Sequence, residues 1–270
     1  MKKIQFGYIA PMCYLDLIPE NATFHLVLTH YLKDPTYLAF YKKKQERGDV
    51  IIADNMAFEL KKSIPSAELI ETIDKSGLQP TYVVAPDYPS QDWKVTWDST
   101  LEFIEQVKGK PYKVMAVPQS TPGDVGGWLK GYLKMLEHPE IAVIGMSILG
   151  IPNAFKWKTG TDDISFNRLY ATQYLLQNKL VVPGQKHHHY LGLGSGPREL
   201  ILQRQLGLID TNDSSSPIWH GHLGIAYDFS QSGLINGKTP IEVDFNCNTT
   251  DIRREFIEFN IEYMERVVLQ

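Results

Sequence analysis

Three aspartates each follow closely on an apolar run of the sequence, at positions where a carboxylate could do chemistry. They are Asp54, Asp87 and Asp213, and Gln119 takes the corresponding place after a fourth apolar run. Asp213 opens the segment Asp-Ser-Ser-Ser-Pro, whose short side chains leave room for a substrate, so this carboxylate could act as a nucleophile. Any one of these residues is explained equally well as a turn former or a helix cap. The hypothesis of a site therefore depends on the whole set.

Taken together, these residues fit the cleavage of a glycosidic or N-glycosidic bond. One carboxylate can attack an electrophilic carbon while a second shuttles protons, as in glycosyl transfer by paired carboxylates. A third carboxylate, with the amide of Gln119, can hydrogen-bond a planar heterocycle.

The elements that must position these residues alternate between short β-branched runs and longer amphipathic stretches. The predicted strands are Ile4–Ile9, Phe24–Leu28, Val50–Ala53, Tyr82–Ala85, Lys113–Val117, Ile141–Ile144, Tyr190–Leu193 and Leu206–Ile209. The predicted helices between them are Pro35–Arg47, Ser66–Ser76, Asp92–Val107, Asp124–Glu137, Asp163–Gln177 and Pro197–Gln205. This alternation predicts an α/β fold, a (β/α)8 TIM barrel, although a doubly wound open sheet would give a similar pattern. In such a barrel the C-terminal ends of the strands build the active site.

The composition predicts a single globular domain over residues 1–270. With 43% hydrophobic residues, the chain can bury a sizeable core. An irregular segment is expected at about 211–250, after the last strand, and a closing helix at about 251–268. The net charge of -4 gives no global attraction to nucleic acid, so any phosphate contact must be local.

Cysteines and histidines give little support to a metal site. Cys13 and Cys247 are the only cysteines, which excludes a disulfide framework and a cysteine-rich zinc site. The run His187-His188-His189, with His220 and His222, could suggest a metal, but histidines in loops more often face solvent or contact phosphate. We expect no metal and no cofactor. No run of 18 apolar residues and no charged leader is present, so we expect a cytoplasmic protein without membrane contact.

The motifs, in their order along the chain, resemble those of the tRNA-guanine transglycosylases and their relatives that act on DNA. Asp54–Glu59 resembles the family's Asp-Ser-Gly-Gly-Phe-Gln, and His189–Gly194 resembles its Tyr-Leu-Met-Gly-Val-Gly. The family's base-reading Asp resembles Asp87, and the Gln of its Val-Gln-Gly-Gly loop resembles Gln119. Its Gly-Gly-Leu segment, whose backbone cradles the base, resembles Gly145, Met146 and Ser147, and its nucleophile with a proline four residues on resembles Asp213 and Pro217.

This resemblance implies a role for each matched residue. Asp213 would attack C1′ of a target guanosine and form a covalent intermediate, with Asp54 as general acid and then base. Asp87 would accept from the ring N–H and exocyclic amine of the base, and Gln119 would contact its carbonyl edge. The cradle would be formed by Gly145, Met146, Leu191 and Gly192, with Phe58 or Tyr88 stacked on the heterocycle. The target nucleotide would have to be flipped out of its stack.

The departures from the family favour DNA as the polymer. The tRNA-acting enzymes carry a cysteine-rich zinc subdomain after the nucleophile, and this chain lacks its ligands. A compact relative without that module resembles the DNA-acting, often phage-encoded branch, which replaces guanine in DNA with a 7-deazaguanine. The implied partners are DNA, or tRNA as the alternative, and a free guanine or 7-deazaguanine base. The sequence does not fix the oligomeric state.

Two other functions remain open from the sequence. The same carboxylates could serve a free-nucleoside hydrolase or deoxyribosyltransferase. Alternatively, the chain could be a catalytically silent nucleic-acid-binding partner of a longer transglycosylase, because Met56, Ala57 and Met146 stand where the family has glycines.

Overall fold

The apolar runs of the sequence form the strands of a barrel. The computed structural model describes residues 3–58, 63–194, 196–230, 233–234 and 251–268. Within this part, the strands are β1 (Gln5–Tyr8), β2 (Phe24–Val27), β3 (Val50–Ala53), β4 (Tyr82–Val84), β5 (Lys113–Ala116), β6 (Ile141–Ser147), β7 (His187–Leu191) and β8 (Thr211–Ser214).

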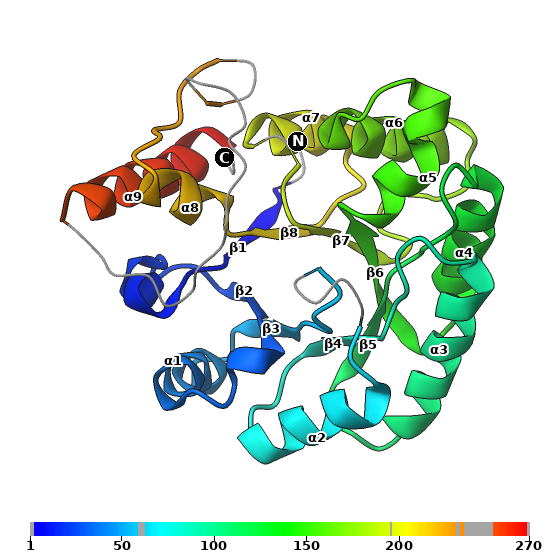
Figure 1. Ribbon diagram of the computed structural model, residues 1–270, viewed down its shortest axis with the longest axis horizontal. Helices are drawn as coiled ribbons and strands as arrows, with labels where there is room; N and C mark the ends of the chain where they lie inside the picture. The colour runs from blue at the N-terminus through cyan, green and yellow to red at the C-terminus, as the bar shows by residue number, and fades with distance from the viewer. Residues whose placement is uncertain (1–2, 59–62, 195, 231–232, 235–250, 269–270) are drawn as a thin grey trace.

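Helices surround this sheet and cover its outer face (Figure 1). The α-helices are α1 (Pro35–Glu46), α2 (Ser66–Ser76), α3 (Trp93–Gln106), α4 (Val125–Glu137), α5 (Gly150–Thr159), α6 (Ile164–Gln177), α7 (Arg198–Leu206), α8 (Ser216–His222) and α9 (Asp251–Tyr263). Two 3-10 segments, η1 (Met12–Leu17) and η2 (Thr29–Tyr31), and a π-helical turn, η3 (Met264–Val268), complete the described elements.

All paired strands are parallel and follow the order β1-β8-β7-β6-β5-β4-β3-β2. The two ends of this ladder lie side by side, since the position of a Cβ on Gly7 of β1 is 3.3 Å from the carbonyl oxygen of Phe24 on β2. The barrel is therefore nearly closed, and the predicted (β/α)8 fold is confirmed. The C-terminal ends of its strands form one rim, which is where the active sites of such barrels lie.

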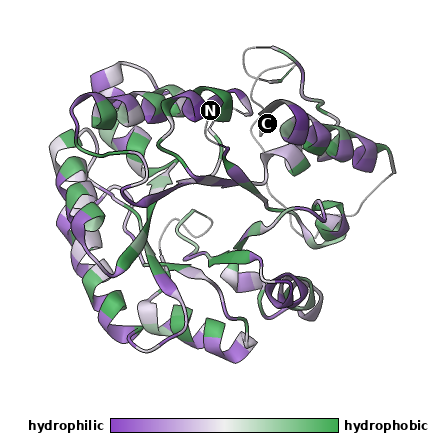
Figure 2. Ribbon diagram, turned by 180° about the vertical axis from the view of Figure 1, so that it is seen from behind, coloured by the Kyte–Doolittle hydropathy of each residue, from purple (hydrophilic) through white to green (hydrophobic). Residues whose placement is uncertain are grey.

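Local sequence explains where the helices begin and end. Asp34 caps α1 by accepting from the backbone N–H groups of Thr36 and Tyr37. Helix α2 ends at Gly77, whose φ of 66° is the left-handed conformation that glycine adopts without strain. Most strands are apolar because both of their faces are covered, while β8 is hydrophilic throughout (Figure 2).

The two last strands differ from their predicted positions. The run Leu206–Ile209 is not a strand: α7 ends at Leu206, and β8 follows only at Thr211–Ser214. The reason is that β8 reads Thr-Asn-Asp-Ser, a polar sequence with low strand propensity whose side chains are all buried. Strand β7 begins three residues before its predicted start and contains the three consecutive histidines.

The segment predicted to be irregular from residue 211 is in fact regular at its start. It begins with β8 and the short helix α8, and an isolated bridge joins Tyr227 to Leu234. Residues 235–250 lie outside the described residues, as do Cys247 and Glu59. The closing helix is confirmed as α9 with η3, and helix α5 was not predicted. No helix in the described ranges is long and apolar enough to cross a membrane.

Candidate active site

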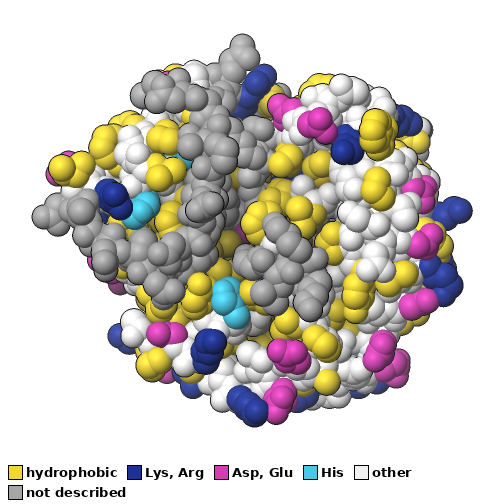
Figure 3. Space-filling model, viewed as in Figure 1, with side chains coloured by type: hydrophobic (Ala, Val, Ile, Leu, Met, Phe, Trp, Pro, Cys, Tyr) yellow, Lys and Arg dark blue, Asp and Glu magenta, His cyan; other side chains and the backbone are white. Residues whose placement is uncertain are grey.

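A cavity of about 620 Å³ opens at the rim formed by the C-terminal ends of the strands, within the usual size range of ligand pockets. Its lining includes Asp54 after β3, Asp87 after β4 and Asp213 within β8. Among the residues that the structure describes, no Lys or Arg lines it. On the face shown in Figure 3, hydrophobic side chains gather near the centre and most charged side chains lie toward the edge.

Asp213 is held by its neighbours on β7. Its Oδ1 accepts from Nε2 of His189 at 2.8 Å and from the backbone N–H of Gly192 at 3.3 Å. The side chain is 5% exposed, and for Oδ2 no hydrogen bond is recorded within the described part of the chain. Because Asp213 lies within the strand, and not in a loop after it as predicted, its carboxylate is fixed by the sheet while one oxygen remains available.

Asp87 is buried among donors from three other segments. Its Oδ1 accepts from Nδ2 of Asn55 at 2.6 Å, and its Oδ2 accepts from Nε2 of Gln119 at 2.5 Å. The hydroxyl of Ser63 donates to the Asp87 carbonyl oxygen at 2.6 Å and accepts from its N–H at 2.9 Å. Burial raises the pKa of the Asp87 carboxyl above its usual value, and these donors partly oppose the shift.

Gln119 contacts Asp87 directly, in addition to any role it has toward a ligand. Its amide nitrogen is engaged with Asp87, while its Oε1 is buried without a partner among the described residues. A Cβ on Gly150, the first residue of α5, would lie 2.6 Å from this Oε1, so the helix can begin here only with glycine. Gln119 itself is not among the residues that line the cavity.

Asp54 lies on a strained turn. Its Oδ2 accepts from the backbone N–H of Met56 at 2.9 Å, and its carbonyl oxygen accepts from the hydroxyl of Thr29 at 2.9 Å. Met56 has a φ of 69°, the left-handed region that a side chain with a Cβ rarely adopts. The backbone thus adopts, at a methionine, a conformation that is natural to glycine. Strain of this kind concentrates at functional sites.

His30 packs over this turn and is itself affected by burial. Its Nδ1 lies 2.9 Å from the sulfur of Met56, and its ring lies 3.9 Å from that of Tyr31, centroid to centroid. Burial, with the nearby charge of Lys33, lowers the pKa of His30 to about 4. The imidazole is therefore neutral near pH 7.

Of the residues predicted to form the backbone cradle, Ser147 lines the cavity, whereas Gly145 and Met146 do not. Gly145 and Met146 are buried and do not line the cavity, because a Cβ on Gly145 would lie 2.8 Å from the Val117 side chain. Glycine is needed there by the packing of the barrel interior. The cavity wall is formed instead by Ser147 and the two residues that follow it.

Of the remaining predicted residues, Leu191, Gly192 and Phe58 line the cavity. Phe58 is 46% exposed, so its ring is accessible for stacking on a planar ligand. Tyr88 is not part of the lining, and its backbone N–H donates to the hydroxyl of Thr96.

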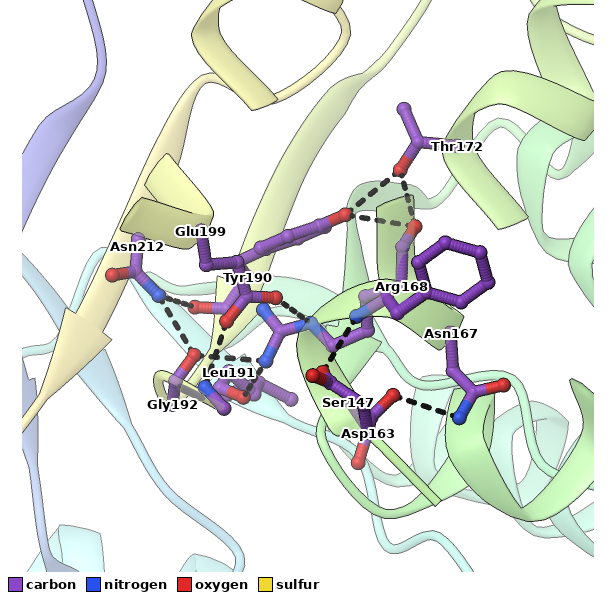
Figure 4. A network of polar contacts seen from close by, with 12 residues as sticks. Ser147, Asp163, Asn167, Arg168, Thr172, Tyr190, Leu191, Gly192, Glu199 and Asn212 are labelled. Atoms are coloured by element: carbon purple, nitrogen blue, oxygen red, sulfur yellow. Dashed lines mark hydrogen bonds and ion pairs between the residues drawn. The ribbon is translucent and has the colours of Figure 1, made fainter. Parts of the chain in front are cut away.

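A buried ion pair fixes the loop that follows β7 (Figure 4). Nε of Arg168 lies 3.0 Å from Oε1 of Glu199, and both side chains are 1% exposed or less. Nη1 of Arg168 donates to the carbonyl oxygens of Leu191 at 3.3 Å and Gly192 at 2.9 Å, while Oε2 of Glu199 accepts from the N–H of Gly194 at 2.7 Å. The backbone of this cavity wall is thereby held from behind.

Neighbouring side chains complete this network. The guanidinium of Arg168 lies 3.8 Å from the centroid of the Tyr190 ring, and the Tyr190 hydroxyl is 2.8 Å from that of Thr172. Nδ2 of Asn212 donates to the carbonyl oxygens of Tyr190 at 2.8 Å and Gly192 at 3.0 Å. Asn212 thus supplies donors to backbone carbonyl groups at the C-terminal end of β7.

The predicted loop histidines lie in regular elements, β7 and α8. His188, His189 and His220 are buried, and His187 and His222 are half-buried. His188 points away from the barrel interior and contacts the hydroxyl of Tyr132 on α4 at 2.7 Å. His220, on α8, lines the cavity and contacts the Tyr227 hydroxyl at 3.2 Å, while His222 contacts the Tyr14 hydroxyl at 2.9 Å. Within the described ranges no group of three or more His, Cys, Asp or Glu side chains could hold a metal ion.

Several residues of the site escaped the sequence analysis. Asn55 and Ser63, the partners of Asp87, carry no signal beyond their proximity to the predicted aspartates. The place of His189 in the barrel interior could have been predicted from the sequence. Residues i and i+2 of a strand lie on the same face, so His187 and His189 point to the same side. The Arg168–Glu199 pair joins residues distant in sequence, and no local pattern reveals it.

The comparisons with known proteins establish the fold alone. No protein-family model matches the chain, and no curated protein is significantly similar to it. The chain is similar in structure to an Aquifex aeolicus VF5 protein (TM-score 0.52, 9% identity, covering 100% of this chain and 95% of that one). It is also similar to the YdjI aldolase from Escherichia coli K12 (TM-score 0.50, 11% identity, 98% and 90% covered). N-acetylneuraminate lyase from Mycoplasma synoviae follows with a TM-score of 0.46, 11% identity and 80% and 69% covered.

The chemical character of the site is that of the cavity at the rim of the barrel. Its described lining holds three carboxylates, several hydroxyls and apolar side chains, and no amine for a Schiff base. Such a cavity favours ligands rich in N–H donors and transition states that carry positive charge.

Proposed function

We propose that this chain is a base-exchange transglycosylase, an enzyme that replaces guanine in DNA with a 7-deazaguanine through a covalent aspartyl–glycosyl intermediate. The observation that carries the proposal is the convergence of Asp54, Asp87 and Asp213 on one cavity that has no cationic side chain in its described lining. The resemblance of the ordered sequence motifs gives these carboxylates their roles. The same exchange on the guanine of tRNA is the alternative, and the small number of cysteines favours DNA.

Each carboxylate has an environment suited to its proposed role. Oδ2 of Asp213 forms the bond to C1′ as the bond from C1′ to the base nitrogen breaks, and the electron pair leaves with the base. Asp54 gives that base a proton, then takes one from the incoming base as its nitrogen attacks C1′ and releases the Asp213 carboxylate. The positive charge that develops on the sugar is stabilised by the carboxylates around it.

Asp87 is proposed to bind the base. Two amides orient its carboxylate, and guanine presents two adjacent N–H donors that match the two oxygens of one carboxylate. Phe58 supplies an exposed ring for stacking at the mouth of the cavity.

The test is incorporation of radiolabelled guanine into polymer. Guanine-containing duplex DNA and tRNA are incubated separately with the protein, and 7-deazaguanines are offered in parallel as competitors. We expect labelled DNA, no label with Asp213→Asn, and normal labelling with Asp210→Asn, a matched control whose carboxylate accepts from the backbone N–H of His188.

The outcomes separate the alternatives. If only tRNA is labelled, tRNA and not DNA is the substrate. Absence of label in both polymers, with cleavage of free nucleosides, would favour a nucleoside hydrolase. Undiminished labelling with Asp213→Asn would refute the covalent role of this carboxylate.

A further inference from the structure

A chain of hydrogen bonds inside the barrel ends on Asp213. Nε2 of His187 lies 2.8 Å from the hydroxyl oxygen of Thr211, which lies 2.8 Å from Nδ1 of His189. Nε2 of His189 in turn lies 2.8 Å from Oδ1 of Asp213. The register of β7 and β8, which pairs His189 with Thr211, brings these four side chains together.

For an ionised Asp213 and a neutral His189, counting donors and acceptors places the protons of this chain. An ionised Asp213 carries no proton, so Nε2 of His189 must be the donor of their hydrogen bond. A neutral His189 then accepts at Nδ1, and Thr211 has a single hydroxyl proton with which to satisfy it. The hydroxyl oxygen of Thr211 therefore accepts from Nε2–H of His187. One neutral tautomer of His189 satisfies all three contacts.

The packing around His189 encloses this imidazole. His189 and Thr211 are 0% and 1% exposed. The ring of Phe24 on β2 lies 5.4 Å from that of His189, centroid to centroid. Gly7 on β1 makes room for Phe24, since a Cβ there would lie 3.1 Å from the Phe24 ring. The imidazole is thus enclosed by the barrel interior.

We propose that His189 is a positioning residue for Asp213, kept in its Nε2–H tautomer by Thr211 and His187. The inferred tautomer does not depend on the proposed function, whereas the effect on catalysis rests on it. The bond from His189 engages Oδ1 and so directs Oδ2 toward the sugar carbon. Since a displacement of about 1 Å in a reacting group can cost about 100-fold in rate, a fixed carboxylate matters.

The tautomer can be measured without any substrate. Nitrogen NMR of protein labelled with 15N-histidine should show, at neutral pH, a His189 whose Nε2 carries the proton and whose Nδ1 does not. The resonance is assigned by its loss in His189→Gln. Thr211→Val, which keeps the shape and removes the hydroxyl, should shift the Nδ1 resonance, and Thr211→Ser should leave it in place. Detection of the Nδ1–H tautomer in the unmodified protein would overturn the proposal.

The positioning role is measured by kinetics of base exchange on the polymer that labels. Thr211→Val should lower kcat by about 10-fold or more with little change in KM, because the nucleophile is misdirected and the base site is intact. Thr211→Ser should restore kcat. Wild-type kcat in a folded Thr211→Val protein would refute the role of the chain. If no polymer is labelled, the proposed function fails and the positioning role of His189 in base exchange fails with it, while the NMR result still decides the tautomer.

Discussion

Replacement of Arg168 by methionine should remove a large part of the stability of this protein. The guanidinium is fully buried against Glu199, and it donates to the carbonyl oxygens of Leu191 and Gly192. Methionine has similar length but no charge and no donor. Loss of one member of a buried ion pair costs about 3–5 kcal/mol, because the remaining charge stays buried without compensation. Single domains are stable by about 5–15 kcal/mol, so the effect is a substantial fraction of the total.

A second substitution, Glu199→Gln, should change the stability in opposite directions in the wild type and in Arg168→Met. In the wild-type background, Glu199→Gln leaves the Arg168 charge unpaired, so it should destabilise the protein. In the Arg168→Met background the same substitution removes an unpaired buried carboxylate, so it should stabilise by about 1 kcal/mol or more. Glutamine keeps an oxygen that can accept from the N–H of Gly194, as Glu199 does now.

The measurement is urea denaturation followed by tryptophan fluorescence, with the free energy of unfolding obtained by linear extrapolation. Arg198→Met is the matched control, since Arg198 is exposed and should change the free energy by less than about 0.5 kcal/mol. Destabilisation by Glu199→Gln in both backgrounds would refute the argument. So would a loss of less than about 1 kcal/mol in Arg168→Met.

Three further predictions concern the other strained or buried groups of the site. Because burial raises the folded-state pKa of Asp87, its contribution to stability is greatest below the unfolded pKa near 3.9 and is lost as the pH rises through the folded pKa. As the pH rises from 4, the free energy of unfolding of the wild type should therefore fall relative to that of Asp87→Asn. His30 has a folded pKa of about 4, below its unfolded value near 6.5, so its contribution is present above pH 6.5 and is lost as the pH falls toward 4. In a His30→Gln variant, the free energy of unfolding should therefore fall less steeply between pH 6.5 and 4 than in the wild type. At Met56, where φ is 69°, a Gly variant should be more stable than an Ala variant by about 1 kcal/mol in denaturant titrations, the reverse of the usual order.

The fold could be predicted because most strands of the barrel are apolar on both faces. Strand β3 and helix α2 lie at their predicted residues, since a short β-branched run and an amphipathic stretch bounded by glycine are both local signals. Strand β8 could not be found in this way. Its polar side chains are tolerated because Asn212 and Asp213 are hydrogen-bonded within the barrel, and this becomes visible only when β7 is beside them.

The site was predictable in its acidic residues and not in the residues that hold them. Asp54 and Asp87 each come directly after an apolar run that predicts a strand. Asp213 is predicted because Pro217 stands four residues after it. Gly145 does not line the cavity and is tightly packed against Val117, so a glycine at a strand end can have a cause other than contact with a ligand. Helix α5 carries Gly and Pro in its first turn, which weakened its helical pattern.

The position of Arg168, whose guanidinium is buried, explains how the described lining of the cavity holds carboxylates and no cation. The donors of Arg168 are directed to the carbonyl oxygens of Leu191 and Gly192 from behind the wall, and its charge is compensated by Glu199. The loop is thus held rigidly while no cation enters the described lining of the cavity. A cation among the aspartates would oppose the positive charge that develops on a sugar ring as its bond to the base breaks. A rigid backbone and an acidic lining are therefore supplied by separate groups, an arrangement that suits the proposed base exchange.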